Sequence, residues 1–283
     1  MHQYRPISLC NALYKIFSKV LANRLKTILP TIITEHESAF TKDRLISDNI
    51  LVAFETLHCM HKHNSSTTRF MTLKLDMSKP FDRVEWTFLE DLMTKIGFSE
   101  KFITLSMICV KTVTYSILVN GEPKGFIQPS RGIRQGDPLS PFLFLLCTEG
   151  LNGLIKHVEM NGDINGFSLC RSGPKLTHLL FADDSLLFCR VTVEECGNVL
   201  NILEAYEGAS RHKINRSKTT LFFSKSTSDD IKSNIKLTLG VLEILQYEKC
   251  LGLTKVTKWR VGNGKSICME EHEWEINMPN FAI

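Results

Sequence analysis

Two adjacent aspartates, Asp183 and Asp184, stand between two apolar runs in the segment from Leu179 to Phe188. Each run has the length and composition of a buried strand, so the sequence predicts a hairpin whose turn carries both acids. Burying a carboxylate without a partner costs free energy, and the fold must accommodate that cost. Two interpretations remain: an exposed turn in which Asp bonds its own backbone, or a site for a divalent cation, which prefers carboxylate oxygens.

A third aspartate ends a separate predicted strand. Met71, Leu73 and Leu75 alternate with polar residues from Phe70 to Asp76, which is the period of a strand. Three carboxylates on neighbouring strands would suit two Mg²⁺ ions about 3.5–4 Å apart, an arrangement that catalyses phosphoryl transfer. The spacing alone does not choose between an exposed turn and a metal site.

The remaining periodicity predicts an α+β chain. A hairpin is expected around Asn120-Gly121, because this dipeptide strongly favours a two-residue turn. We expect Pro30 to end the first helix and Gly97 to follow the third. Helices are predicted over residues 11–29, 47–61, 84–96, 100–111, 139–157 and 193–208, and a further strand over 219–223.

Composition excludes several classes of protein. No apolar run among the 283 residues approaches the roughly 20 that a membrane helix needs, and the first residues lack the apolar region of a secretory signal. Nine cysteines occur without a C-x-x-C pair, which indicates reduced thiols inside the cell, in cytoplasm or nucleus. Before Asp76, ten Lys and Arg stand against five acids, so this stretch carries +5, compared with +4 for the whole chain. Such a charge permits a polyanionic partner.

Six strings decide between the interpretations of the aspartates. They are Tyr4–Leu9, Ser38–Phe40 with Arg44, Leu75–Asp82, Arg134–Pro141, Phe181–Asp184 and Tyr247–Leu253. In this order they resemble the reverse transcriptase domain of LINE-type (non-LTR) retrotransposons, especially those of plants. The resemblance covers residues 4 to 253, and the ordered set is far more specific than a lone Phe-Ala-Asp-Asp.

The resemblance implies a right-hand polymerase with an antiparallel palm sheet and flanking helices. It places N-terminally truncated fingers at 1–75 and a palm with inserted fingers elements and the catalytic site at 76–253. We expect an irregular tail at 254–283, in place of a thumb that is largely missing. In this family an endonuclease usually precedes the reverse transcriptase, and this sequence does not include one. We therefore expect the chain to be a truncated copy of a retrotransposon.

The resemblance also implies an RNA-directed DNA polymerase, which adds dNTPs to a primer 3′-hydroxyl on an RNA template. In such enzymes Asp76, Asp183 and Asp184 would hold two Mg²⁺ ions, with Mn²⁺ as a substitute, and the Met77 carbonyl would join the second ion. Lys218 resembles the lysine that protonates the pyrophosphate leaving group. A solvated lysine before a strand is an equally good interpretation of Lys218.

Four further residues resemble those that contact the incoming nucleotide. Phe81 occupies the sugar-gate position, where a ring would clash with a ribose 2′-hydroxyl. Gln135 and Gly136 resemble the loop against the nucleotide and the template base, and Arg44 resembles the fingers arginine that grips the triphosphate. Asp43 departs from the family, which usually has glycine there.

Two other functions stay open. The chain would be a catalytically inactive relic that at most binds nucleic acid, if the departures from the family abolish activity. A group II intron-type maturase shares the palm, but the strings fit the LINE type better. The expected partners are an RNA template, a DNA primer or target DNA and dNTPs, with no membrane; the sequence does not specify an oligomeric state.

Overall fold

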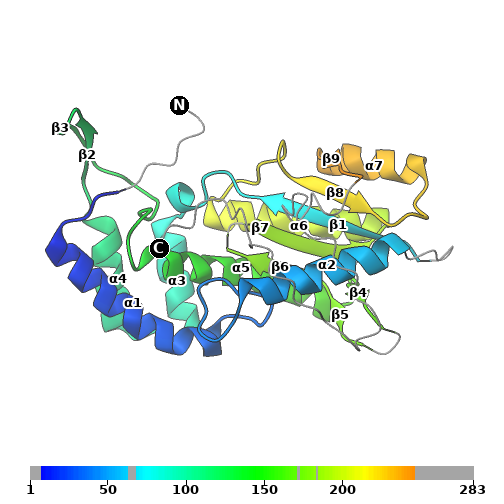
Figure 1. Cartoon of the computed structure of the whole chain (residues 1–283), viewed down its shortest axis with the longest axis horizontal. Helices are drawn as coiled ribbons and strands as arrows, with labels where there is room; N and C mark the ends of the chain where they lie inside the picture. The colour runs from blue at the N-terminus through cyan, green and yellow to red at the C-terminus, as the bar shows by residue number, and fades with distance from the viewer. Residues whose placement is uncertain (1–7, 63–67, 171–172, 183, 246–283) are drawn as a thin grey trace, which may run out of the picture. The chain divides into compact units, whose positions relative to one another are not determined.

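The core of the fold is a five-stranded sheet, seen in the computed structural model of residues 8–62, 68–170, 173–182 and 184–245 (Figure 1). The strands run in the order β6 (His178–Phe181), β7 (Asp184–Arg190), β1 (Phe70–Asp76), β8 (Thr220–Phe223) and β9 (Leu242–Glu243). All neighbours pair antiparallel except β8 and β9, which are parallel. The predicted strand over 70–76 and the predicted antiparallel sheet are therefore confirmed.

The described residues form seven helices in addition to the strands. Their bounds are α1 (Ala12–Ile32), α2 (Ile46–Lys62), α3 (Trp86–Ile96), α4 (Glu100–Lys111), α5 (Ser140–Met160), α6 (Val193–Ser210) and α7 (Asp229–Leu239), with a 3-10 turn at Phe81–Arg83. Six agree with the predicted ranges to within a few residues. Within the described ranges, no helix is long and apolar enough to cross a membrane.

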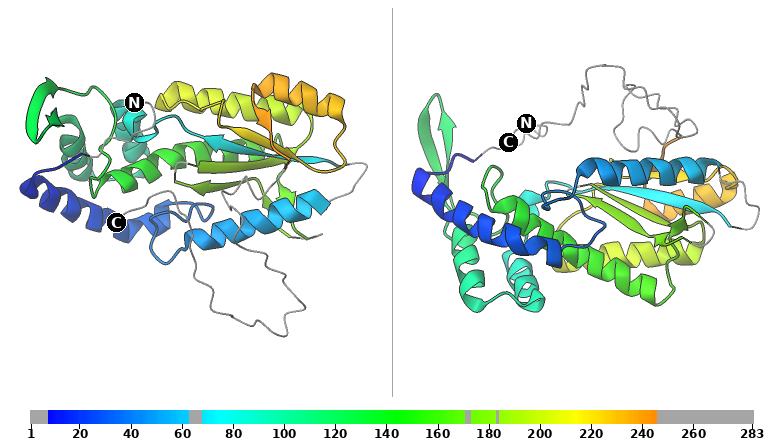
Figure 2. Two further views of the ribbon diagram at one scale, coloured as in Figure 1. Left: turned by 45° about the horizontal axis from the view of Figure 1, so that its top comes forward. Right: turned by 60° about the horizontal axis from the view of Figure 1, so that its bottom comes forward.

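The alternation of β1 separates two hydrophobic clusters on opposite faces of the sheet. Met71, Leu73 and Leu75 belong to the larger cluster, with residues of α1, α3, α4, α5 and α6. Phe70 belongs to the smaller cluster beneath α2. Figure 2 shows α2 on one face of the sheet and α5 on the other. A side-chain period of two thus places the central strand between two helical layers.

The first helix differs from its predicted end. Asn11 caps its start, because the Asn11 side-chain oxygen accepts a hydrogen bond from Tyr14 N at 2.7 Å. Pro30, however, lies inside the last turn, and the helix continues to Ile32. The prediction that Pro30 ends the helix was wrong because proline so near the C-terminus removes only one backbone bond, while Ile33 N still donates to Leu29 O at 2.8 Å.

The predicted hairpin is present as β2 (Tyr115–Val119) and β3 (Glu122–Ile127). Asn120 has φ 52° and Gly121 has φ 84°, so both turn residues adopt the positive φ that a type I′ turn requires. The helix α7, the strand β9 and the short pair β4 (Phe167–Ser168) and β5 (Lys175–Leu176) were not predicted. The strands β4, β5 and β9 have only two residues each, too few to show a period.

The division into fingers at 1–75 and palm at 76–253 stays a prediction. The tail at 254–283 and the string Tyr247–Leu253 lie outside the described residues.

Leu73 provides a test of the sheet's central role. It is 1% exposed and pairs with Leu187 on one side and Leu221 on the other. We expect Leu73→Ala to lower the free energy of unfolding by about 2–5 kcal/mol, because it leaves a cavity between strands and helices. Urea unfolding followed by circular dichroism measures this. Leu118→Ala, at a 60% exposed position of the β2–β3 hairpin, is the control; an equal loss in both variants would contradict the assignment.

Candidate active site at the end of the central strands

Two of the predicted metal-binding aspartates lie opposite each other on neighbouring strands. Asp76 is the last residue of β1, Asp184 is the first of β7, and the two form a cross-strand pair in the ladder. Like charges directly opposite each other are destabilising, so this pair favours a nearby cation. Lys74 Nζ lies 3.6 Å from Asp184 Oδ2, but the pair is partly exposed and contributes little. Asp183 lies outside the described residues.

A residue with a left-handed backbone conformation lies between β6 and Asp184. Phe181 pairs with Asp184, and Ala182, which follows Phe181, has φ 55°. A residue with a Cβ pays free energy for this conformation unless its surroundings hold it there. Ala182 N donates to Glu37 Oε2 at 3.1 Å, and Leu180 N donates to His36 O at 2.9 Å. The segment before α2 therefore fastens the turn.

Glu37 is fully buried and was not identified from the sequence. Its Oε1 also accepts from Ala39 N at 2.7 Å. Burial raises the pKa of Glu37 to about 7, and the hydrogen bonds from the amides of Ala39 and Ala182 oppose this rise. No periodicity marks Glu37, because its importance comes from a contact with a turn 145 residues away.

Arg44 lies near this segment, but its guanidinium is directed at the backbone. It donates to the carbonyl of Thr34, to Glu37 O at 2.7 Å, to Ile33 O at 3.0 Å and, at the longest distance, to Pro30 O. These bonds tie the end of α1 to the segment that carries Glu37. A contact between Arg44 and a triphosphate stays a prediction.

Asp43 occupies the position where the family usually has glycine. Its φ is 62°, in the left-handed region that glycine adopts freely and Asp tolerates better than most residues. The backbone of this turn therefore keeps a conformation typical of glycine.

The chain after Asp76 runs beside residues 213–219. Met77 forms a bridge with Ile214, and Asn215 N donates to Asp76 O at 2.8 Å. Thr219 Oγ1 accepts from Asp76 N at 3.2 Å. The segment that carries Lys218 is thus bonded to the end of β1, and Lys218 itself is exposed.

Phe81 lies on the 3-10 turn that follows, and two neighbours fix it. Ile133 N donates to Phe81 O at 2.8 Å. The Phe81 ring stacks on Phe144 of α5, with centroids 4.9 Å apart and planes inclined by 16°. Next to Ile133, Gly132 has φ 89°, and a Cβ there would lie 2.8 Å from Asp82 O. Only glycine allows the two backbone segments to approach so closely.

Gln135 and Gly136 follow on the same loop. Ser8 N donates to Gln135 O at 3.1 Å, and Gly136 has φ 91°. Gln135 and Gly136 lie two and three residues after Ile133, whose backbone is bonded to Phe81. The loop that carries Gln135 and Gly136 is therefore bonded to Phe81 through the backbone of Ile133.

A buried aspartate anchors this loop. Asp137 Oδ2 accepts from Tyr14 OH at 2.5 Å, and Asp137 Oδ1 accepts from Leu139 N at 3.1 Å. The Arg134 guanidinium lies 3.8 Å from the centre of the Tyr14 ring. Burial and the neighbouring Asp137 raise the pKa of Tyr14, so its hydroxyl remains a donor. Tyr14 and Asp137 are supporting residues that the sequence analysis did not assign.

Comparison with known proteins identifies the family. Residues 1–254 match the family described as reverse transcriptase (RNA-dependent DNA polymerase). The chain belongs to the reverse transcriptase family. This match includes all of the described residues, so the sheet, the paired aspartates and the anchored loop are parts of a reverse transcriptase domain.

Several curated relatives are similar to this reverse transcriptase domain. A 149 kDa protein of transposon TX1 from Xenopus laevis is 26% identical over 294 residues, covering 97% of this chain and 22% of that protein. The Pol polyprotein of retrotransposable element R2 from Nasonia vitripennis is 28% identical over 187 residues, 65% of this chain and 17% of its own length. An uncharacterized mitochondrial protein of Arabidopsis thaliana is 52% identical over 68 residues, 24% of this chain and 56% of that protein. The chain therefore spans little more than half of one relative and about a fifth of the others.

Solved structures support the architecture. Telomerase from Candida tropicalis aligns with a TM-score of 0.51 at 13% identity, covering 75% of this chain and 34% of the telomerase. Telomerase from Candida albicans aligns with a TM-score of 0.50 at 14% identity, covering 77% and 35%. Likeness at this identity shows the fold alone, and it confirms the predicted α+β polymerase architecture.

The raised pKa of Glu37 gives a pH-dependent prediction for stability. The pKa of Glu37 is about 7 in the folded chain, compared with 4.5 for an ordinary glutamate, so the folded state binds the proton more tightly. Stability from this group is complete below about pH 4.5 and is lost as pH rises through 7. Relative to Glu37→Gln, the unmutated chain should lose up to about 3 kcal/mol over this range.

Urea unfolding of both proteins at pH 5, 6, 7 and 8 measures this difference. The control is Glu90→Gln, which removes an exposed carboxylate paired with Lys111. A difference between the Glu37→Gln variant and the unmutated chain that stays constant with pH would contradict the prediction.

Proposed function

We propose that this chain is the RNA-directed DNA polymerase of a plant LINE-type (non-LTR) retrotransposon, and that it adds dNTPs to a primer 3′-hydroxyl on an RNA template. The observation that carries the proposal is the cross-strand pair of Asp76 and Asp184 in a reverse transcriptase domain. The TX1 and R2 relatives support the non-LTR lineage. The Arabidopsis relative, 52% identical over 68 residues, supports a plant source.

Reverse transcriptases generally use divalent metal ions. The donor set here fits such an ion, because two carboxylates lie opposite each other at the same end of the neighbouring strands β1 and β7. Asp76, Asp183, Asp184 and the Met77 carbonyl would hold two Mg²⁺ ions, for which Mn²⁺ would substitute. When bound, the ions would lower the pKa of the primer hydroxyl and neutralise charge on the phosphates.

The proposed reaction is an in-line displacement at the α-phosphorus of the dNTP. The primer 3′-oxygen loses its proton to solvent and forms the new P–O bond, while the bond from the α-phosphorus to the bridging oxygen breaks. Pyrophosphate leaves with that bonding pair. Lys218, exposed on a segment bonded to the end of β1, would donate the proton that the pyrophosphate takes up.

Three residues would read the incoming nucleotide. Phe81 would pack under the deoxyribose and exclude a 2′-hydroxyl, while Gln135 and Gly136 would lie against the nucleotide and the template base. The backbone bond between Ile133 and Phe81 supports this grouping. For Arg44, the four carbonyl bonds from Nη1 and Nη2 support a role in positioning the Glu37 segment.

The proposed partners are an RNA template and a DNA primer or target DNA. The +5 charge before Asp76 suits the phosphates of both. Action on chromosomal DNA requires access to the nucleus.

Primer extension tests the proposal directly. With an RNA template, a DNA primer, dNTPs and Mg²⁺, we expect extension by the unmutated chain and a loss of at least about 10²–10³-fold for Asp76→Asn or Asp184→Asn, because each removes charge that holds the cations. Asp183→Ala extends the test to the third carboxylate. Asp91→Asn, an exposed change on α3, is the matched control and should retain activity.

Circular dichroism establishes that each variant is folded. A folded chain that does not extend the primer would contradict the polymerase and support the alternative, a relic that at most binds nucleic acid. Equal extension by Asp76→Asn and the unmutated chain would contradict the assignment of the site.

A further inference from the structure

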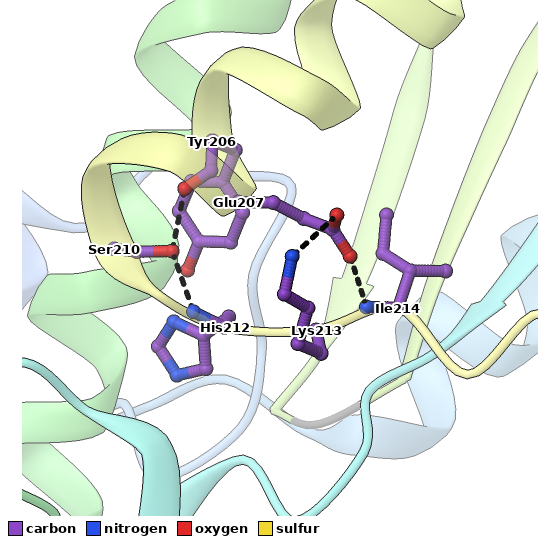
Figure 3. A network of polar contacts seen from close by, with 6 residues as sticks. All are labelled: Tyr206, Glu207, Ser210, His212, Lys213 and Ile214. Carbon is purple, nitrogen blue, oxygen red and sulfur yellow. Dashed lines mark hydrogen bonds and ion pairs between the residues drawn. The ribbon is translucent and has the colours of Figure 1, made fainter.

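A buried histidine forms a hydrogen bond with the backbone of the turn between Asp76 and Phe81. His212 is 1% exposed and lies just after α6, and its Nε2 is 3.1 Å from Pro80 O (Figure 3 shows the imidazole). A carbonyl only accepts hydrogen bonds, so Nε2 carries the proton and donates it. Among the described residues Nδ1 has no hydrogen-bond partner, and burial lowers the pKa of His212 to about 4. The ring is therefore a neutral donor.

The same imidazole also contacts the aromatic ring that supports Phe81. His212 meets Phe144 edge-to-face, with centroids 5.9 Å apart and planes inclined by 77°. Phe144 in turn stacks on Phe81 at 4.9 Å. On its other side His212 stacks on Tyr206, with centroids 5.6 Å apart and planes inclined by 2°. One side chain thus bonds the backbone immediately before Phe81 and packs against the ring beneath it.

Hydrogen bonds at the end of α6 fix the position of His212. Its backbone N donates to Ser210 Oγ at 3.2 Å, and Ser210 Oγ donates to Tyr206 O at 2.6 Å (Figure 3). The next residues are held by Glu207, which accepts from Ile214 N at 2.6 Å and from Lys213 Nζ at 3.3 Å. The imidazole therefore projects from a braced segment.

The turn itself needs such support. Lys79 has φ 50°, a left-handed conformation that is costly for a residue with a Cβ. Ser78 N donates to Lys213 O at 2.8 Å, so the turn is bonded to the His212 segment on both sides of Lys79. Without the bond from His212, the Pro80 carbonyl would be left without this donor in a buried setting, and the turn would be free to shift.

We propose that His212 is a positioning residue that sets the place of the Phe81 ring and thereby the discrimination between dNTPs and rNTPs. The proposal rests on the polymerase function and on Phe81 as the group that meets the sugar. Exclusion of a 2′-hydroxyl depends strongly on the position of the Phe81 ring. The chemical step depends on it less, because the reacting atoms would be held by the aspartates at the end of β1. Loosening His212 should therefore admit the 2′-hydroxyl while preserving most of the incorporation of dNTPs.

Single-nucleotide incorporation of a dNTP and of the matching rNTP, on an RNA template with a DNA primer, measures this ratio. For His212→Ala we expect the ratio of kcat/KM for dNTP to that for rNTP to fall by about 10-fold or more. His212→Gln, whose amide N–H is able to donate to the Pro80 carbonyl, should recover part of it. Phe81→Val, which removes the gate ring, is the positive control and should lower the ratio further.

His178→Phe is the structural control. His178 is also a buried histidine, but on β6 it contacts Asn152 and Thr177 and not the Phe81 turn. Its loss should lower stability and both incorporation rates together, and leave the ratio unchanged. Thermal unfolding of each variant separates folding defects from changes in selectivity.

The outcomes separate the two proposals. A lower ratio in His212→Ala with partial recovery in His212→Gln supports the positioning role. Equal losses for dNTP and rNTP in both His212 variants, with the ratio retained, would overturn it while leaving the polymerase intact. An unmutated chain that incorporates no dNTP would overturn the proposed function and this inference with it.

Discussion

The register between β1 and β7 is the constraint on which the rest of the site depends. Because side chains alternate between the faces of a sheet, a shift of one residue would move Leu73 and Leu75 from the core to the opposite face. The hydrophobic core therefore fixes the register, and the register places Asp76 opposite Asp184. The cost of two carboxylates in one cross-strand pair is met by the packing of apolar residues along the rest of the ladder.

The buried titratable groups in this part of the chain change folding stability in opposite directions as pH varies. The pKa of Glu37 is raised to about 7, so Glu37 lowers stability as pH rises from the ordinary glutamate pKa of 4.5 through 7. His178 and His212, with pKa values lowered to about 3 and about 4, cost stability as pH falls below about 6.5, since the unfolded chain then binds protons that the folded chain refuses. For these three groups together, the two histidines outweigh the one glutamate, so their combined contribution to stability falls as pH drops below about 6.5.

Local pattern was enough to predict most elements, and tertiary contact decided the rest. The strand over 70–76 and the turn at Asn120-Gly121 follow from alternation and from positive-φ preference, both properties of neighbouring residues. Glu37 and His212 could not be found in this way, because each acts on a backbone group more than a hundred residues away. For Arg44, resemblance predicted a role at the nucleotide, but the guanidinium bonds to backbone carbonyls depend on how α1 ends, which local pattern does not determine.

The two turns that carry the proposed chemistry share one structural solution. Ala182 lies two residues before Asp184 and Lys79 lies two residues before Phe81, and both adopt a positive φ without being glycine. Such a conformation costs about 1–3 kcal/mol and persists only where neighbours fix it. In each case a buried side chain bonds the backbone of that turn: Glu37 accepts from Ala182 N, and His212 donates to Pro80 O. Because Glu37 bonds the turn before Asp184 and His212 bonds the turn before Phe81, we expect separate substitutions at Glu37 and His212 to affect the proposed chemistry and the proposed sugar selection differently.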